Sequence, residues 1–252
     1  MVDICAPKAR CIGFWGSTTK FGERRRQRRH PEYQRPELMA TGPNRCWSWD
    51  ITKLRGPSRG EWYALLVMLD IYSRMVVGWM LVRRANAAIA KAFIEQTNAD
   101  LHIAPGTLTI HADRGVEMTA DSVCELLERL AVKRSHSRPH VSDDNPYSES
   151  QYRTMKYASN FPDRFESFED ARSHTSTCMT YYNTEHRHSG IAMLTPADVH
   201  TGVGLTKLAS RHAVMRAAFQ QRPERFVHGE PTLSTIPAHV SINRPIENDQ
   251  AA

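Results

Sequence analysis

Short runs of apolar residues separated by turn residues dominate the middle of the chain. Residues 46–53 alternate apolar and polar side chains, the period-two pattern of a strand with one buried face. Two apolar runs, 63–69 and 75–82, predict buried strands joined by a tight connection at 70–74. The Gly- and Pro-rich stretch 56–60 predicts a turn before them. We therefore expect three neighbouring strands.

Helices and strands alternate after this point. The pattern predicts a helix from the cap Asn86 to about His102, a strand at 107–111, a helix at 121–130 and a short strand at 132–135. Asn145 followed by Pro146 then resembles a cap with Pro at the first helical position. This order predicts an α/β fold, a sheet layered with helices.

Three segments differ in pattern. Residues 1–40 have no sustained periodicity and predict a basic, mostly extended lead-in. The core is expected over 41–200, and 201–252 should hold one helix, 205–220, and a Pro-spaced tail. In that helix Leu205, Leu208, Val214 and Phe219 suggest an apolar stripe, with Lys207, Arg211 and Arg216 available to phosphate. An assembly contact and docking on the chain's own core both remain open.

Composition excludes some classes of protein. No apolar run in the 252 residues approaches the roughly 20 that a membrane-spanning helix requires, and 1–20 lacks the features of a signal peptide. The five cysteines are an odd number without metal-like pairs, so we interpret them as free thiols. We expect no membrane association and a location in the cytoplasm.

The net charge of +6 is concentrated near the start of the chain. Residues 1–40 hold nine Lys or Arg less four Asp or Glu, which gives +5. Most of the excess lies in residues 23–30, including Arg24, Arg25 and Arg26. Such a run fits an arm that binds a polyanion, and a solvated basic tail is the alternative.

Three carboxylates occupy positions where α/β sheets build sites. Asp50 lies in the first strand, Asp113 follows the fourth strand, and Glu149 lies in the first turn of a helix. If their oxygens converge on one point, they could hold Mg²⁺, which prefers oxygen ligands. Two such ions roughly 3.5–4 Å apart could activate an attacking oxygen and stabilise a leaving one.

The residues around these acids resemble the bacterial insertion-sequence transposases of the retroviral integrase superfamily. The resemblance lies in 47–52 (WSWDIT), 111–115 (HADRG) and 142–150 (SDDNPYSES), with thirty-five residues between the last two acids. It extends to 69–74 (LDIYSR), 77–79 (VGW), Lys156, 181–190 (YYNTEHRHSG) and 194–196 (LTP). It covers about residues 40–200 and continues more weakly to about 245.

The resemblance implies a ribonuclease-H-like mixed sheet flanked by helices. It also implies that Asp50, Asp113 and Glu149 form an Asp-Asp-Glu site for two Mg²⁺ ions, with Mn²⁺ as a substitute. The activity would be strand cleavage and strand transfer at insertion-sequence ends. The partners would be double-stranded DNA, both transposon ends and target, and further copies of the chain.

DNA contacts are expected beside the acids. Lys156 follows Glu149 by seven residues, close to two helical turns, so it should project from the same face and reach a phosphate. A solvated lysine, or one linked to Glu149 through Arg153, is the alternative. Arg138 and His140, in the loop before the helix, are further candidates.

Other conspicuous residues fit structural roles. Asp70 also ends a strand, but Asp-x-x-Ser-Arg between apolar strands favours a turn held by side-chain capping, so we leave it outside the site. The spacing of His186, His188 and His200 favours packing or hydrogen bonding over zinc. The tryptophans on strands are expected to be core and rim aromatics and not base-stacking platforms; they are Trp47, Trp49, Trp62 and Trp79.

The resemblance fails before the core. Residues 1–20 show no helix pair of a helix-turn-helix, and the spacing of Cys5, Cys11, His30 and Cys46 is wrong for the retroviral zinc module, so the chain is expected to lack an end-recognition region at its amino terminus. A DNA-binding protein from an upstream reading frame, or a fusion with it, could supply one. Two rival functions follow: a truncated or domesticated remnant that binds DNA or inhibits an intact transposase, and a nuclease of the same fold.

Overall fold

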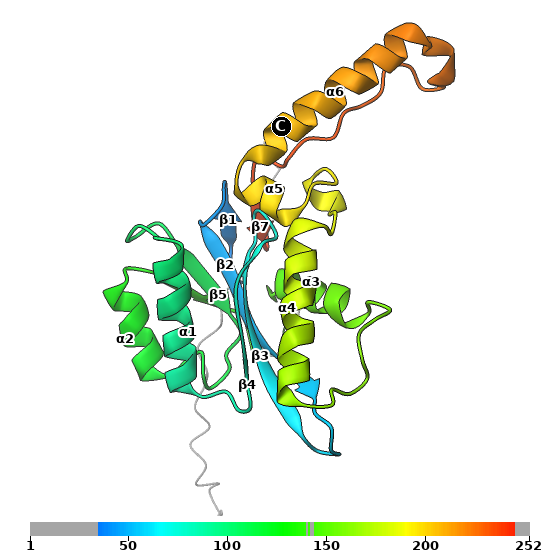
Figure 1. Cartoon of the computed structure of the whole chain (residues 1–252). Helices are drawn as coiled ribbons and strands as arrows, with labels where there is room; N and C mark the ends of the chain where they lie inside the picture. The colour runs from blue at the N-terminus through cyan, green and yellow to red at the C-terminus, as the bar shows by residue number, and fades with distance from the viewer. Residues whose placement is uncertain (1–34, 140, 142–143, 245–252) are drawn as a thin grey trace, which may run out of the picture. The chain divides into compact units, whose positions relative to one another are not determined.

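The computed structural model describes residues 35–139, 141 and 144–244 (Figure 1). These residues belong to one compact unit, Gln34–Ala252. Arg24, Arg25, Arg26 and His140, which we predicted to contact DNA, lie outside the described residues. Within the described ranges, no helix is both long and apolar enough to cross a membrane.

A mixed five-stranded sheet, in the order β4-β3-β2-β5-β6, forms the centre of the fold. Antiparallel pairing joins β2 to β3 and β3 to β4, whereas β2, β5 and β6 run parallel. The strands are β2 (Cys46–Arg55), β3 (Trp62–Asp70), β4 (Val76–Val82), β5 (Thr109–Ala112) and β6 (Lys133–His136). The three neighbouring strands and the two later ones agree with the sequence pattern.

Helices cover both faces of the sheet, α1 and α2 on one side and α3 and α4 on the other (Figure 1). The period-two pattern of β2 explains this division. Trp47 and Trp49 are almost fully buried and pack with α1 and α2. The alternate residues of β2 face α3. The helices are α1 (Ala87–Asp100), α2 (Asp121–Arg129), α3 (Pro146–Lys156) and α4 (Phe168–Thr184).

Two short strands at the ends of the described chain also pair. β1 (Leu38–Ala40) is antiparallel to β7 (Val240–Ile242). Ala40 and Ile242 are fully buried and pack with Cys46 and Ile71 at the start and end of the β2–β3 pair. The chain before residue 41 and the chain after residue 200 therefore each contribute one strand to this part of the core.

The remaining elements lie between α4 and β7. They are the 3₁₀ turns Ser189–Ile191 and Pro223–Arg225 and the helices α5 (Pro196–His200) and α6 (Val203–Gln221). The side chains of Tyr182, His186 and His188 pack against one another, and His200 Nδ1 lies 2.9 Å from Ser73 Oγ. These are the packing and hydrogen-bonding roles that the sequence predicts for the histidines.

Candidate active site

Asp50 lies on the face of β2 that α3 covers. Its Oδ1 accepts a hydrogen bond of 2.7 Å from the backbone amide of Ile51, and its backbone carbonyl accepts one of 2.8 Å from Tyr152 Oη. Burial raises the pKa of Asp50 from 3.8 to about 7. The carboxylates of Asp113 and Glu149 raise the pKa further, and the Ile51 amide and Lys156 lower it.

Asp113 follows β5, the parallel neighbour of β2. The last residues paired between these strands are Trp49 and Ala112, so Asp50 and Asp113 come next at the same level of adjacent strands. Asp113 is exposed, and its Oδ1 accepts a 2.6 Å hydrogen bond from Ser137 Oγ. The parallel pairing therefore brings two carboxylates that are distant in sequence to one edge of the sheet.

Glu149 lies in the first turn of α3, which begins with Pro146. The helix runs alongside β2, with Ser148 contacting Ser48, Tyr152 contacting Asp50 and Lys156 contacting Thr52. The contacts recur every four residues on the helix, a rise of roughly 6 Å, and every two residues on the strand, a rise of roughly 6.6 Å. Because the two distances are nearly equal, the same contact geometry repeats along both elements. This match fixes Glu149 and Lys156 along the strand that carries Asp50.

The three predicted acids are thus close enough to interact electrostatically. Both Asp113 and Glu149 act on the pKa of Asp50, from β5 and α3. Among the described residues, however, no three His, Cys, Asp or Glu side chains lie close enough together to hold a metal ion as they stand. All three acids offer carboxylate oxygens, the ligands that Mg²⁺ prefers, so their chemistry fits such an ion.

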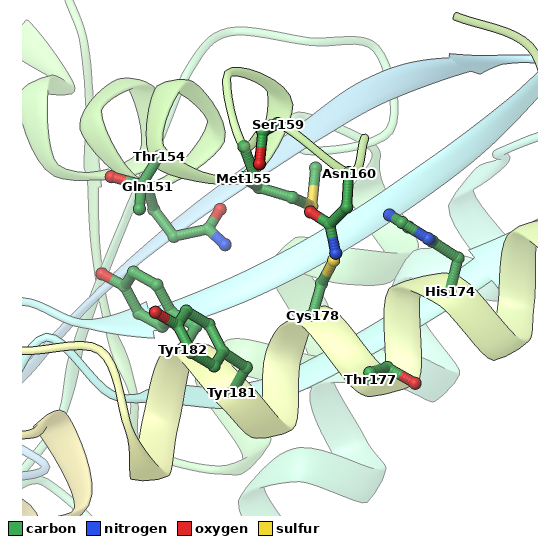
Figure 2. A pocket seen from close by; sticks show the side chains of 11 residues that line it. Gln151, Thr154, Met155, Ser159, Asn160, His174, Thr177, Cys178, Tyr181 and Tyr182 are labelled. Atoms are coloured by element: carbon green, nitrogen blue, oxygen red, sulfur yellow. The ribbon is translucent and has the colours of Figure 1, made fainter. Parts of the chain in front are cut away.

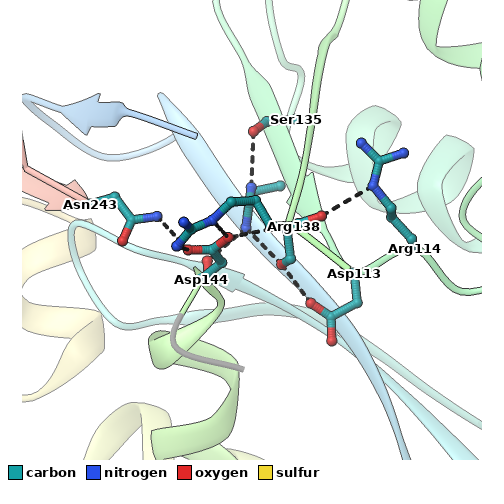
Figure 3. Close-up of polar contacts among 8 residues, drawn as sticks. Asp113, Arg114, Ser135, Arg138, Asp144 and Asn243 are labelled. Atoms are coloured by element: carbon teal, nitrogen blue, oxygen red, sulfur yellow. Dashed lines mark hydrogen bonds and ion pairs between the residues drawn. The ribbon is translucent and has the colours of Figure 1, made fainter. Parts of the chain in front are cut away.

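A polar network supports the loop between β6 and α3 (Figure 3). Arg138 donates to both carboxylate oxygens of Asp144, at 2.9 and 3.0 Å, and Asn243 donates to Asp144 at 2.7 Å. The hydrogen bonds from Arg138 hold the pKa of Asp144 well below its usual range. The guanidinium of Arg138 therefore links the chain just after β6 to Asp144, just before α3 and Glu149, and its contact with DNA stays a prediction.

The buried residue His111 links this network to the strands. Its Nδ1 lies 3.0 Å from Ser135 Oγ, and its Nε2 lies 2.8 Å from the carbonyl oxygen of Asp144. Burial lowers the pKa of His111, which favours the neutral ring. A neutral ring donates from one nitrogen and accepts at the other, which suits a serine hydroxyl on one side and a carbonyl on the other.

Sequence reasoning missed several of these supporting residues. Ser137, Asp144, Tyr152 and Asn243 each bond to a predicted site residue or to the loop that carries one. Asp144 and Tyr152 lie within about five residues of Glu149 in sequence, but their partners are set by the fold. Asn243 lies ninety-nine residues from Asp144, and its sequence surroundings gave no signal.

A separate pocket of about 570 Å³ lies between α3 and α4 (Figure 2). Its residues carry no carboxylate, lysine or arginine, and burial lowers the pKa of its one histidine, His174. It is therefore poorly suited to a metal ion or a phosphate. The sheet edge with the three acids is the better candidate for chemistry.

Comparison with known proteins gives consistent matches. Residues 40–142 match the family model described as integrase core domain, and residues 130–196 match a second model of the same description. The transposase for insertion sequence element IS904 of Lactococcus lactis subsp. lactis (strain IL1403) is 28% identical over 196 residues. That match covers 74% of this chain and 75% of the relative.

Transposase InsF for insertion sequence IS3A of Escherichia coli (strain K12) is 30% identical over 164 residues, 64% of this chain. The match spans about half of that relative, 55% of its length. Among solved structures, the simian T-cell lymphotropic virus intasome in complex with PP2A regulatory subunit B56 gamma aligns with a TM-score of 0.51 and 18% identity. It covers 68% of this chain and 60% of that chain, and with the mixed sheet it confirms the predicted ribonuclease-H-like fold.

Proposed function

We propose that this chain, which matches integrase core domain models and is similar to insertion-sequence transposases, cleaves DNA strands at the ends of an insertion sequence and joins them to a target. Asp50, Asp113 and Glu149 are the proposed metal ligands and catalytic residues. The observation that carries the proposal is the arrangement of the elements that bear these acids: β2 pairs in parallel with β5, and α3 lies along β2.

Divalent cations held by these three carboxylates would act as the Lewis acids in the reaction. Two Mg²⁺ ions, or Mn²⁺ in their place, would activate the attacking oxygen and stabilise the leaving one. The chain's own residues position the ligands. Tyr152 holds the backbone of Asp50, and Ser137 holds the carboxylate of Asp113. Lys156 donates to Thr52 beside Asp50, from where it can reach a phosphate of the bound strand.

The substrate in this proposal is double-stranded DNA, which would place the protein at the nucleoid. Joining requires two DNA ends in one complex, and one such site handles one end. The working form would therefore contain at least two copies of the chain on DNA. Recognition of the end sequence is assigned to a DNA-binding product of an upstream reading frame or to a fusion with it.

The experiment compares cleavage of a duplex from the boundary of the encoding element by the wild type and by Glu149→Gln, with Mg²⁺. The amide is nearly isosteric but lacks the charge that holds a metal, so we expect cleavage to fall by at least about a hundredfold. Folding and DNA affinity in EDTA should stay unchanged. Glu125→Gln, at an exposed position on α2, is the control. Wild-type cleavage by Glu149→Gln would remove this residue from the site.

A further inference from the structure

Trp62 differs from the other tryptophans on β2 and β3. Trp47 and Trp49 are 0% and 1% exposed, whereas Trp62, the first residue of β3, is 45% exposed. Trp47 and Trp49 are therefore core aromatics and Trp62 is a rim aromatic, the two kinds of position that the sequence predicts for the strand tryptophans. A large aromatic surface left in contact with water on one strand end is a candidate contact for a ligand.

Two hollows meet at this side chain. One, of about 880 Å³, is lined by Trp62 and Lys53 together with the proposed metal ligands Asp50 and Asp113. The other, of about 480 Å³, is lined by the same Trp62 and Lys53 together with Lys156. Trp62 and Lys53 therefore line both the hollow that holds Asp50 and Asp113 and the hollow that holds Lys156, which we expect to contact a phosphate.

The charges of these hollows favour a polyanion. Apart from the two proposed metal ligands, the basic residues lining them are Lys53, Arg55, Arg83, Arg84 and Lys156, and the acidic ones are Glu61, Glu117 and Asp163. Some of these are paired, since Arg55 bonds to Asp163 at 2.5 Å and Arg83 lies over the ring of Phe168. Lys53 and Arg84 are exposed. Both can therefore reach a DNA phosphate.

The protein covers the side chain of Trp62 only in part, since 45% of it is exposed. The guanidinium of Arg55 lies 5.8 Å from the centroid of its ring, and Arg55 lines the smaller hollow but not the larger. Trp62 therefore lines the larger hollow without Arg55. A hollow of this volume accommodates a ligand the size of a nucleotide. A nucleobase can stack on an open indole face, whatever the sequence of the strand.

We propose that Trp62 stacks on one unpaired base of the DNA strand whose phosphodiester lies at Asp50 and Asp113, with Lys53 and Arg84 on its phosphates. The inference rests on the proposed function and adds a requirement for local unpairing. A base inside a duplex offers no free face, so a strand that uses Trp62 has to release a base from the stack. A DNA end that is already frayed should therefore bind more tightly than a fully paired end.

The test measures binding in EDTA, where no cleavage occurs, to two duplexes that differ only in two mismatched terminal pairs. The wild type should prefer the frayed duplex, and Trp62→Ala should lose that preference, a change of about 5- to 100-fold in the affinity ratio. Trp62→Phe should keep most of it. Tyr181→Ala, which removes another exposed aromatic on α4, is the control and should keep all of it.

A 2-aminopurine at the frayed position gives a second signal, because stacking on Trp62 should quench it in the wild type and not in Trp62→Ala. Equal affinity of the wild type for both duplexes would overturn the inference. Equal weakening of both duplexes by Trp62→Ala would also overturn it, because Trp62 would then serve the fold or the backbone contact. The binding assay does not measure cleavage. If the wild type fails to cleave DNA in the separate cleavage assay, the proposed function is contradicted, but the binding result still tests the role of Trp62.

Discussion

Replacing Asp50 with asparagine should stabilise the protein at pH 8 when no divalent cation is present. Burial raises the pKa of this carboxyl to about 7, and the carboxylates of Asp113 and Glu149 add to the effect. The charged form is therefore disfavoured in the folded state. Asparagine removes the charge and keeps an oxygen that can accept the 2.7 Å hydrogen bond from the amide of Ile51.

The sign and the magnitude follow from linkage. An unfolded Asp titrates near pH 3.9, so between about pH 4 and pH 7 only the folded state keeps the proton. Wild-type stability therefore falls relative to Asp50→Asn as pH rises through this window, and the difference levels off above pH 7. A shift from 3.8 to about 7, at about 1.36 kcal/mol per unit, gives roughly 4 kcal/mol at pH 8.

Water that reaches the half-buried carboxylate screens part of this free energy, so we expect a measured difference of about 1–3 kcal/mol at pH 8. For a chain of this size that corresponds to roughly 3–10 °C in Tm. At pH 5 the linkage contribution is about 1.5 kcal/mol before screening, so the difference between the variants should shrink.

Thermal unfolding of the wild type and Asp50→Asn, in EDTA at pH 5 and pH 8, measures the effect. Glu125→Gln, which loses a charge at an exposed site on α2, is the control and should show no such pH dependence. Adding Mg²⁺ at about 100 times its Kd should stabilise the wild type alone, by about 2.7 kcal/mol. If Asp50→Asn is no more stable than the wild type at pH 8, or if the difference in stability is the same at both pH values, the pKa of Asp50 is not raised in the folded protein.

Three further changes probe the support of the site and the amino-terminal arm. Tyr152→Phe leaves the carbonyl of Asp50 without its 2.8 Å donor. It should cost about 1–3 kcal/mol in urea unfolding and slow cleavage more than it weakens DNA binding; unchanged cleavage would show that Asp50 is held by other contacts. Asn243→Ala removes one of the donors to Asp144 and should cost about 1 kcal/mol and slow cleavage, whereas wild-type rates would mean that Arg138 suffices. Deleting residues 1–30 should flatten the salt dependence of DNA binding, by about 0.9 in the log–log slope for each phosphate that the arm neutralises; an identical slope would show that the arm does not touch DNA.

The elements around the acids could be predicted because their signals are local. The alternation in 46–53 and the apolar runs after it identify β2, β3 and β4, and Asn86 caps α1 as its position suggests, accepting from the amide of Ile89. The turn after β3 could also be predicted, because the residues that form it are neighbours in sequence. Asp70 accepts hydrogen bonds from both the amide and the hydroxyl of Ser73, each at 2.7 Å, as predicted for a turn held by side-chain capping.

The support of the site could not be predicted because its partners are distant in sequence. β1 and β7 have three residues each, too few to show a period, and about two hundred residues separate them. The contact between Asn243 and Asp144 depends on that pairing, because it brings the chain after Ile242 to the loop before α3. A three-residue strand is recognised only when its partner is known.

The carboxy-terminal helix α6 contains several apolar residues, but they do not lie on one face of the helix. Leu205 and Val214 are nine residues apart, about 900° around a helix, and therefore point in opposite directions. Their side chains are 67% and 66% exposed, whereas Leu208 is 6% exposed and packs on the core, so the predicted apolar stripe is wrong.

The predicted phosphate contacts of this helix are partly taken up by the chain itself. Lys207 donates to Asp198 at 2.6 Å, and Arg211 donates to the backbone carbonyls of Ala192 and Met193. The first half of α6 is thereby fixed to the core. Ending the chain after His200 would remove these contacts together with β7, the partner of β1. Such a truncation therefore tests the fold and the loop before Glu149, and an assembly role for α6 has to be tested by substitution at its exposed positions.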